Sequence, residues 1–239
     1  MSSGIYSALS GARSRMQLLE VVSNNLANVH TVGFKKDRLN FESLISDARQ
    51  QSLARGVNHS RVGMRYTDHG TGTFQTTGNN LDLAINGPGF FKVQTPEGEA
   101  YTRQGSFRLN ADGTLVTAAG YPVVGANGPV NLPDADVVID ESGRIWDDEA
   151  IVGEIAVFEV LDPQQLEKRG DGLFAAAEPA GEARVANPEL AQGQLESSNV
   201  NPLEEMAMMI DAQRNFEALT RAIKSYKEMG KAAELGRVG

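Results

Sequence analysis

The carboxy-terminal stretch from Asn199 to Met229 constrains the fold more than any other part of the chain. Asn201 is a suitable N-cap, Pro202 suits the first position of a helix, and no further proline or glycine occurs before Gly230. Apolar residues recur every seven positions in two series offset by three, namely Met209, Phe216 and Ile223, and Ala212, Leu219, Tyr226 and Ala233. Because charged residues fill the opposite positions, the pattern predicts a helix over 200–239 with an apolar face that needs a partner.

A second apolar stripe lies at the amino terminus. Ile5, Ala12, Leu19 and Leu26 are spaced by seven residues, and Leu9, Met16 and Val22 broaden the apolar stripe beside them. Arg15 interrupts the repeat, so the stripe predicts an amphipathic helix of roughly 25 residues within 1–32 rather than a strict heptad. We expect the two terminal helices to pack on each other, on copies of themselves, or both.

The middle of the chain has a different pattern. From 79 to 186, short apolar segments alternate with turn signals such as Asn86-Gly87-Pro88-Gly89, and Asp112-Gly113 separates two hairpin arms. This region predicts an all-β domain with a twisted, partly closed sheet.

Two connectors complete the predicted organisation. Residues 33–78 are expected to form one of them, with Phe41, Leu44, Ile45 and Leu53 on a short helix followed by extended segments, and residues 187–199 the other. The predicted fold class is α+β multidomain, in which long N- and C-terminal helices pack as a coiled-coil-like pair around an inserted all-β domain.

Charge and composition exclude several classes of function. Residues 66 to 200 contain seven Lys and Arg against 21 Asp and Glu, which argues against a nucleic-acid groove, although the basic first 65 residues leave an acidic partner open. The chain has no cysteine, and His30, His59 and His69 do not have the spacing of a zinc site. No apolar run is long enough for a membrane span, and no cleavable secretory signal is visible. The sequence therefore predicts no catalytic, cofactor-binding or metal site.

Six residues near the end of the first predicted helix, Ser23-Asn24-Asn25-Leu26-Ala27-Asn28, are mostly polar and form helices poorly. One interpretation is a fraying helix end, stopped by Gly33 and the β-branched residues before it. The other is that the asparagine amides make specific hydrogen bonds across a helix interface and fix its register. The residues alone favour the first interpretation.

Three dispersed motifs resemble those of the bacterial flagellar basal-body rod and hook proteins. They are Ser23–Asn28 followed by Gly33-Phe34-Lys35; Leu81–Phe91 together with Tyr101–Phe107; and Leu195–Asn201 followed by Glu205-Met206, Met209-Ile210, Gln213-Arg214 and Phe216-Glu217. The motifs occur in the same order as in the family and span nearly the whole chain. Within that family, the chain most resembles the shorter rod subunits. With this resemblance, the register interpretation of the asparagines becomes the preferred one.

The resemblance implies a structural subunit of the rod, the drive shaft that crosses the periplasm and transmits torque for motility. Its implied partners are copies of itself, neighbouring proximal-rod subunits and the distal-rod protein, with passage through the flagellar type III export apparatus explaining the missing signal. The implied location is the basal body, without direct membrane insertion, nucleic acid or cofactor. The alternatives are a distal-rod or hook-type paralogue of the same architecture, or a ligand-binding β domain dimerised by helices.

The residues expected to form the assembly interface lie on the two terminal helices and in the motifs beside them. They are Ile5, Leu9, Ala12, Met16, Leu19, Val22, Asn24, Asn25, Leu26, Asn28, Asn199, Asn201, Met206, Met209, Ile210, Gln213, Phe216, Leu219, Ile223 and Tyr226.

Overall fold

The computed structural model describes residues 2–45, 58–176 and 181–235, which fall into two compact units. The first, here called the helical unit, comprises Met1–Ala27, Asp37–Asp68 and Asn201–Gly239. The second, the β unit, comprises Asn28–Lys36 and His69–Val200. Each unit is therefore assembled from segments that lie far apart in the sequence.

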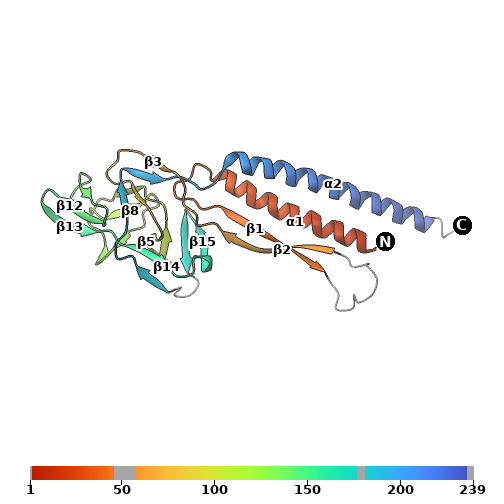
Figure 1. Cartoon of the computed structure of the whole chain (residues 1–239), viewed down its shortest axis with the longest axis horizontal. Helices are drawn as coiled ribbons and strands as arrows, with labels where there is room; N and C mark the ends of the chain where they lie inside the picture. The colour runs from red at the N-terminus through yellow and green to blue at the C-terminus, as the bar shows by residue number, and fades with distance from the viewer. Residues whose placement is uncertain (1, 46–57, 177–180, 236–239) are drawn as a thin grey trace. The chain divides into compact units, whose positions relative to one another are not determined.

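The described residues of the helical unit form two helices and one hairpin. Helix α1 (Ser2–Ala27) packs beside α2 (Pro202–Leu235), and the hairpin of β1 (Asp37–Ile45) and β2 (Asn58–Thr67) lies along α1 (Figure 1). The predicted N-cap is present, because the Asn201 side-chain oxygen accepts a hydrogen bond from the backbone N–H of Leu203 at 3.1 Å. The predicted fold class, with packed terminal helices and a β-rich region between them, is confirmed.

A single antiparallel register relates the two helices. A Cβ atom added at Gly4 would lie 3.2 Å from the Tyr226 ring, and one added at Gly11 would lie 3.3 Å from Leu219. Each step of seven residues along α1 is thus matched by seven residues back along α2. Small residues of α1 accept the large side chains of α2, so the contact line runs through two glycines that the apolar stripe did not include.

The β1–β2 hairpin replaces part of the predicted connector. The short helix expected at Phe41, Leu44 and Ile45 is wrong, because these residues lie in β1, where Phe41 pairs with Val62 and Ile45 pairs with Asn58. The local sequence could not reveal this pairing, since the partner strand begins only at Asn58 and strand preference depends on contacts with such a partner. Leu53 lies outside the described residues.

A sheet of eight strands forms the body of the β unit. β5 pairs with three neighbours, β6, β9 and β14, and is almost fully buried up to Val93. The strands are β5 (Phe90–Thr95), β6 (Gly98–Thr102), β9 (Val123–Gly125), β10 (Gly128–Pro129), β14 (Val157–Val160), β15 (Leu166–Gly170), β16 (Leu173–Ala176) and β17 (Glu182–Arg184). The core beneath this sheet contains Leu83, Phe91 and Ile145, so the unit has an apolar centre of its own.

Smaller elements surround this sheet. The predicted hairpin at Asp112-Gly113 is confirmed, because β7 (Phe107–Leu109) pairs with β8 (Leu115–Thr117) across that turn. A three-stranded sheet is formed by β11 (Val138–Ile139), β12 (Arg144–Asp147) and β13 (Ala150–Glu154). A short 3-10 helix, η1 (Pro163–Gln165), precedes β15.

The return segment at 187–199 carries more structure than a connector. β18 (Leu190–Gln192) pairs with β4 (Leu83–Ile85), and β19 (Gln194–Glu196) pairs with β3 (Phe74–Thr76). The β unit therefore extends past the predicted limit at 186. Both pairings join residues more than a hundred positions apart, which explains why local periodicity did not indicate them.

Candidate assembly site

Three charged side chains form a buried ion cluster in the β unit. The Glu196 carboxylate lies 2.5 Å from the Lys35 ammonium through one oxygen and 3.3 Å from the Arg103 guanidinium through the other. The side chains of Lys35 and Glu196 are each 1% exposed, and that of Arg103 is 5% exposed. Because buried charges are strongly disfavoured without partners, the presence of all three together fixes where each segment lies.

Backbone groups complete the ion cluster. The N–H of Gly72 donates to the Glu196 carboxylate at 2.8 Å, and the Lys35 ammonium donates to the Gly70 carbonyl at 2.9 Å. Gly33 has a φ of +66°, and its N–H donates to the backbone carbonyl of Glu196 at 2.7 Å. Residues 33–35, 70–72 and 196 are thus held together in the β unit.

Asn199 strengthens the same junction of segments. Its side-chain oxygen accepts from the backbone N–H of Lys36 at 2.7 Å, and its own N–H donates to the Phe34 carbonyl at 3.2 Å. Two of the motifs that carry the family resemblance, one near each end of the chain, therefore meet in the β unit. The sequence motifs contain Lys35, Arg103 and Glu196 but did not predict that these residues pair. Their presence in the three motifs was the only signal.

Asn25 holds a second polar cluster, in the helical unit. This side chain is 1% exposed, donates to the Asp37 carbonyl at 2.9 Å and accepts from the Asp37 N–H at 2.9 Å. It also donates to the Glu205 carboxylate of α2 at 3.3 Å, in the register set by Gly4 and Gly11. The Asp37 carboxylate in turn accepts hydrogen bonds from Arg65 and Thr67.

Both interpretations of the asparagine-rich stretch have some support. α1 ends at Ala27, within the stretch, as a helix end would. Asn25 nevertheless bonds to the partner helix of its own chain, whereas Asn24 is exposed and Asn28 accepts a hydrogen bond from the Thr31 hydroxyl. A role of these amides between copies of the chain stays a prediction.

The residues predicted for the assembly interface differ in exposure. Three are buried in the single chain, namely Ala12, Val22 and Asn25. The partly buried ones are Ile5, Leu19, Leu26, Asn28, Asn199, Met209, Phe216, Leu219, Ile223 and Tyr226. The exposed ones are Leu9, Met16, Asn24, Asn201, Met206, Ile210 and Gln213.

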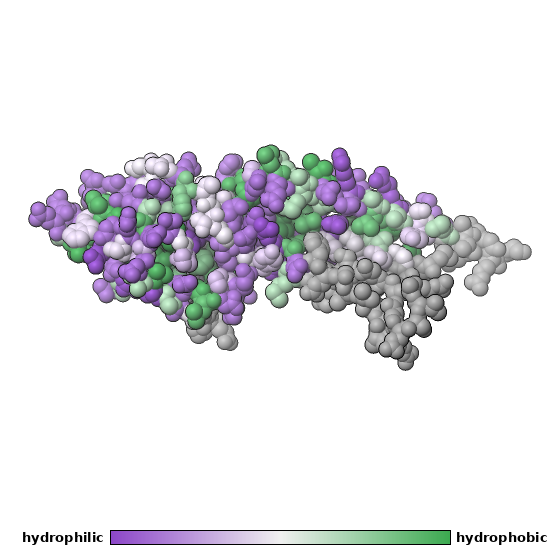
Figure 2. All heavy atoms as spheres, in the orientation of Figure 1, coloured by the Kyte–Doolittle hydropathy of each residue, from purple (hydrophilic) through white to green (hydrophobic). Residues whose placement is uncertain are grey.

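This division distinguishes the contact between the two helices of one chain from the apolar residues that the chain leaves exposed. Gly11 and Leu219 lie where the helices of one chain meet, while Ile210 is 54% exposed and Leu9 is 55% exposed. Figure 2 shows hydrophobic residues along the two helices at the surface of the helical unit. A role of these exposed apolar residues between molecules stays a prediction.

His69 is a partly buried ring in the β unit. It packs edge-on against Phe90 with ring centroids 5.7 Å apart, and its Nε2 lies 3.0 Å from the Pro163 carbonyl. Nδ1 is buried without a hydrogen-bond partner among the described residues. Burial lowers the pKa of His69; the hydrogen bond to Pro163 opposes this, and the charges of Lys35, Lys168 and Arg103 lower it further.

We expect the β unit to lose stability in mild acid through His69. The folded pKa lies below the ordinary value of 6.5, so the unfolded chain binds the proton more readily and stability falls as the pH drops below 6.5. The loss attributable to one histidine is at most about 1.4 kcal/mol per pH unit. Urea unfolding at several pH values should show it, and His69→Gln, whose amide can still donate to Pro163, should flatten the dependence.

His30→Gln is the matched control, since His30 is exposed. The assignment is wrong if His69→Gln and His30→Gln follow the same pH profile as the unchanged chain.

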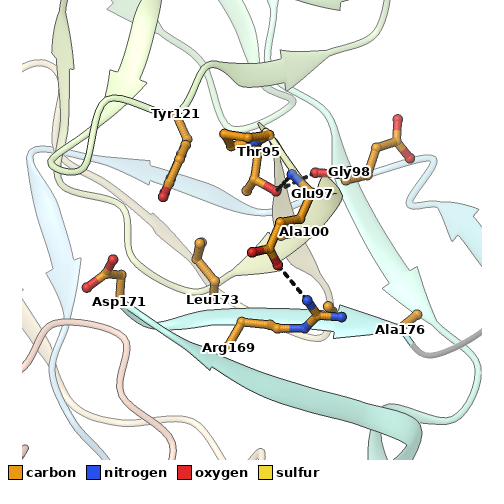
Figure 3. Close-up of a pocket in the computed structure, with 12 residues that line it drawn as sticks. Thr95, Glu97, Gly98, Ala100, Tyr121, Arg169, Asp171, Leu173 and Ala176 are labelled. Carbon is orange, nitrogen blue, oxygen red and sulfur yellow. Dashed lines mark hydrogen bonds and ion pairs between the residues drawn. The ribbon is translucent and has the colours of Figure 1, made fainter.

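One pocket in the β unit has a volume of about 370 Å³. Figure 3 shows Arg169 paired with Glu97 on one side of it and Tyr121 on the other, and the Thr95 hydroxyl donates to the Gly98 carbonyl within the turn. The Arg169–Glu97 pair is well exposed, and no His, Ser, Cys or Lys lines the pocket. Its lining therefore offers no nucleophile paired with a base.

Over the described ranges, no group of three or more His, Asp or Glu side chains is placed to hold a metal ion. No described helix combines the length and apolar character needed to cross a membrane.

The fold and the two polar clusters define a class of subunit in which both chain ends form an antiparallel helical pair and the β unit is inserted between them. Comparison with known protein families shows which family of such subunits the chain matches. Residues 5–35 match the family described as flagella basal body rod protein, 84–146 the flagellar hook protein FlgE/F/G D1 domain, and 191–234 the flagellar basal body rod FlgEFG protein C-terminal domain.

Curated relatives agree with these matches over nearly the whole chain. The chain is 35% identical to the flagellar basal-body rod protein FlgG of Bacillus subtilis, covering 96% of this chain and 97% of the relative. It is 33% identical to FlgF of Caulobacter vibrioides over 100% of both chains, and 32% identical to FlgF of Mesorhizobium japonicum over 91% and 90%. The chain belongs to the flagellar basal-body rod and hook protein family. The expected similarity to the rod subunits of that family is confirmed, and FlgF is among these relatives.

Proposed function

We propose that this chain is a structural subunit of the flagellar basal-body rod and that it polymerises through its terminal helices. The rod crosses the periplasm and transmits torque for motility, and the subunit reaches it through the flagellar type III export apparatus. Relatives named as basal-body rod proteins over nearly the full length support this proposal.

The apolar residues that one chain leaves exposed on its helices carry the proposal. Leu9 and Met16 of α1 are 55% and 49% exposed, and Met206 and Ile210 of α2 are 41% and 54% exposed. Fully burying one such side chain stabilises an interface by roughly 1.5 to 3 kcal/mol. Repeated in a head-to-tail lattice that does not close on itself, these contacts would hold a long polymer together.

The polar clusters support the same function in a different way. The Lys35–Arg103–Glu196 cluster fixes segments within the β unit, and Asn25 fixes α1 against α2 within the helical unit. A torque-bearing subunit must keep such registers under load, and buried polar partners oppose slippage because a shift leaves them unpaired. The proposed partners are further copies of the chain and other rod subunits, with no catalysis and no cofactor.

We expect Ile210→Asp to abolish incorporation into rods while leaving the subunit folded. Ile210 is exposed in the single chain, so the change spares the packing of α1 on α2 but places a charge in the proposed contact between subunits. Phe216→Asp should also abolish incorporation, but Phe216 is partly buried, so that change can act within the chain as well. The measurement is swimming, together with the amount of subunit in purified basal bodies.

Asn215→Asp is the control, because it adds the same charge at an exposed polar position of α2. Normal swimming and normal incorporation of Ile210→Asp, judged beside this control, would contradict the proposed assembly surface.

A distal-rod position is the second candidate, favoured by the 35% identity to FlgG. Both positions require the same terminal-helix contacts. They are separated by which rod subunits the chain contacts in basal bodies, read by cross-linking and mass spectrometry.

A further inference from the structure

One face of the β11–β12–β13 sheet carries large apolar side chains in adjacent positions. Val138 is paired with Trp146, and Trp146 is paired with Ile151, so the three side chains form one row across the sheet. Val138 is 63% exposed and Ile151 is 54% exposed. The opposite face of the same sheet carries Ile139 and Ile145, which are buried in the core.

This row differs from a scatter of single exposed residues. An antiparallel sheet with one face on the core usually turns polar side chains to water. Here both faces are apolar, and the single tryptophan of the chain stands at the centre of the outer one, held by a hydrogen bond from its Nε1 to Asp140 at 3.3 Å. Tryptophan is enriched where protein partners bind.

The charge beside the row limits what can cover it. Three acidic residues lie where β12 turns into β13, namely Asp147 at the end of β12 and Asp148 and Glu149 in the turn. Two copies of this face brought together would oppose acidic turns, and a symmetric pair would also close into a dimer rather than continue a polymer. The occupant should therefore be a different, basic and apolar surface.

The helical unit presents such a surface on the β1–β2 hairpin. Met64 is 75% exposed and Tyr66 is 40% exposed, two residues apart on β2 and hence on one face. Arg38 is the strand partner of Tyr66, so it lies on that face, and its side chain is 47% exposed. Its Nε donates to the Asp68 carboxylate at 2.9 Å, and because a guanidinium has five N–H donors, it can contact a second carboxylate as well. This hairpin face combines an aromatic ring, a thioether and a guanidinium.

We propose that the Val138–Trp146–Ile151 row of one subunit docks on the Arg38–Met64–Tyr66 face of a second copy. The apolar side chains cover one another, and Arg38 lies against the acidic turn of its neighbour. Because the two faces are different, the contact repeats head to tail. The inference rests on the proposed function, since it places the contact between subunits of the rod.

The absence of cysteine in the chain makes a direct test possible. Two differently tagged full-length chains, one with Ile151→Cys and one with Met64→Cys, are expressed together in cells lacking the native copy and treated with a short bismaleimide. The expected result is a cross-linked pair carrying both tags in purified basal bodies. Met64→Cys with Leu161→Cys is the matched control, because Leu161 is 79% exposed in the β unit but lies outside the row.

A second pair, Val138→Cys with Tyr66→Cys, guards against a local disturbance at either first position. The proposal is overturned if rods contain both tagged chains but neither pair cross-links, if Ile151→Cys links to itself, or if it links to a different protein. In those cases the presence of the chain in rods leaves the proposed function standing. Absence of even the unchanged chain from basal bodies would overturn the function and the docking together.

Discussion

Replacing Glu196 with glutamine is expected to destabilise the β unit by about 3–5 kcal/mol, the range for breaking a buried ion pair. The substitution keeps the shape of the side chain but leaves the ammonium of Lys35 and the guanidinium of Arg103 facing a neutral amide. Both cations are almost completely buried, so water cannot replace the lost carboxylate. Urea unfolding followed by the fluorescence of Trp146, which lies in the same unit, measures the change.

Glu189→Gln is the matched control. Glu189 is an exposed glutamate of the same return segment and accepts a hydrogen bond from Asn86, so its loss should change stability by no more than about 0.5 kcal/mol. Lys35→Met combined with Glu196→Gln should lower the free energy of unfolding by less than the sum of the two single changes. In the double variant neither Lys35 nor Glu196 is left as a buried charge without its partner. Equal stability of the Glu196→Gln and Glu189→Gln chains would show that the ion cluster does not hold the β unit.

Replacing Gly33 with alanine is expected to cost about 3 kcal/mol, from a strained backbone and a steric overlap together. Gly33 has a φ of +66°, which a residue with a Cβ adopts with difficulty. The added Cβ would also lie 2.4 Å from the backbone carbon of Arg103, which is main chain and cannot rotate away. The same overlap would displace Arg103 from Glu196. The urea assay described above should therefore show a lower free energy of unfolding for the β unit.

Gly78→Ala isolates the steric part of that effect. Gly78 has a φ of +73°, and an added Cβ there meets nothing within 4 Å. This control therefore keeps the backbone strain, about 1 kcal/mol, and removes the overlap. If the two alanine substitutions destabilise the β unit equally, the steric overlap between residue 33 and residue 103 does not contribute to the loss of stability.

The elements that the sequence predicted correctly are those with local causes. The helix beginning at Pro202 follows from the Asn201 cap and a long stretch without proline or glycine, and the β7–β8 hairpin follows from the Asp112-Gly113 turn. In both cases residues within a few positions of each other determine the structure. The family motifs were equally readable, because they are contiguous in the sequence.

The errors and omissions have a common physical reason. Phe41, Leu44 and Ile45 of β1 were predicted on a short helix, and residues 187–199 as a connector, because the strand partners of these segments are not their sequence neighbours. The apolar stripe of α1 was recognised, yet the glycines that receive Leu219 and Tyr226 were not, since a glycine has no hydropathy signal and its role appears only beside the partner helix.

The sequence by itself therefore determined the terminal helices, the β-rich insertion and the family, because caps, turns and periodic apolar residues act locally. Only the tertiary structure decided that Glu196 pairs with Lys35 and Arg103, that Asn25 reaches Glu205, and which apolar helix residues remain exposed. These facts depend on the burial and geometry of groups that meet only after folding. The identity of a charged or amide residue does not by itself tell whether its side chain will be exposed to water or buried in a core.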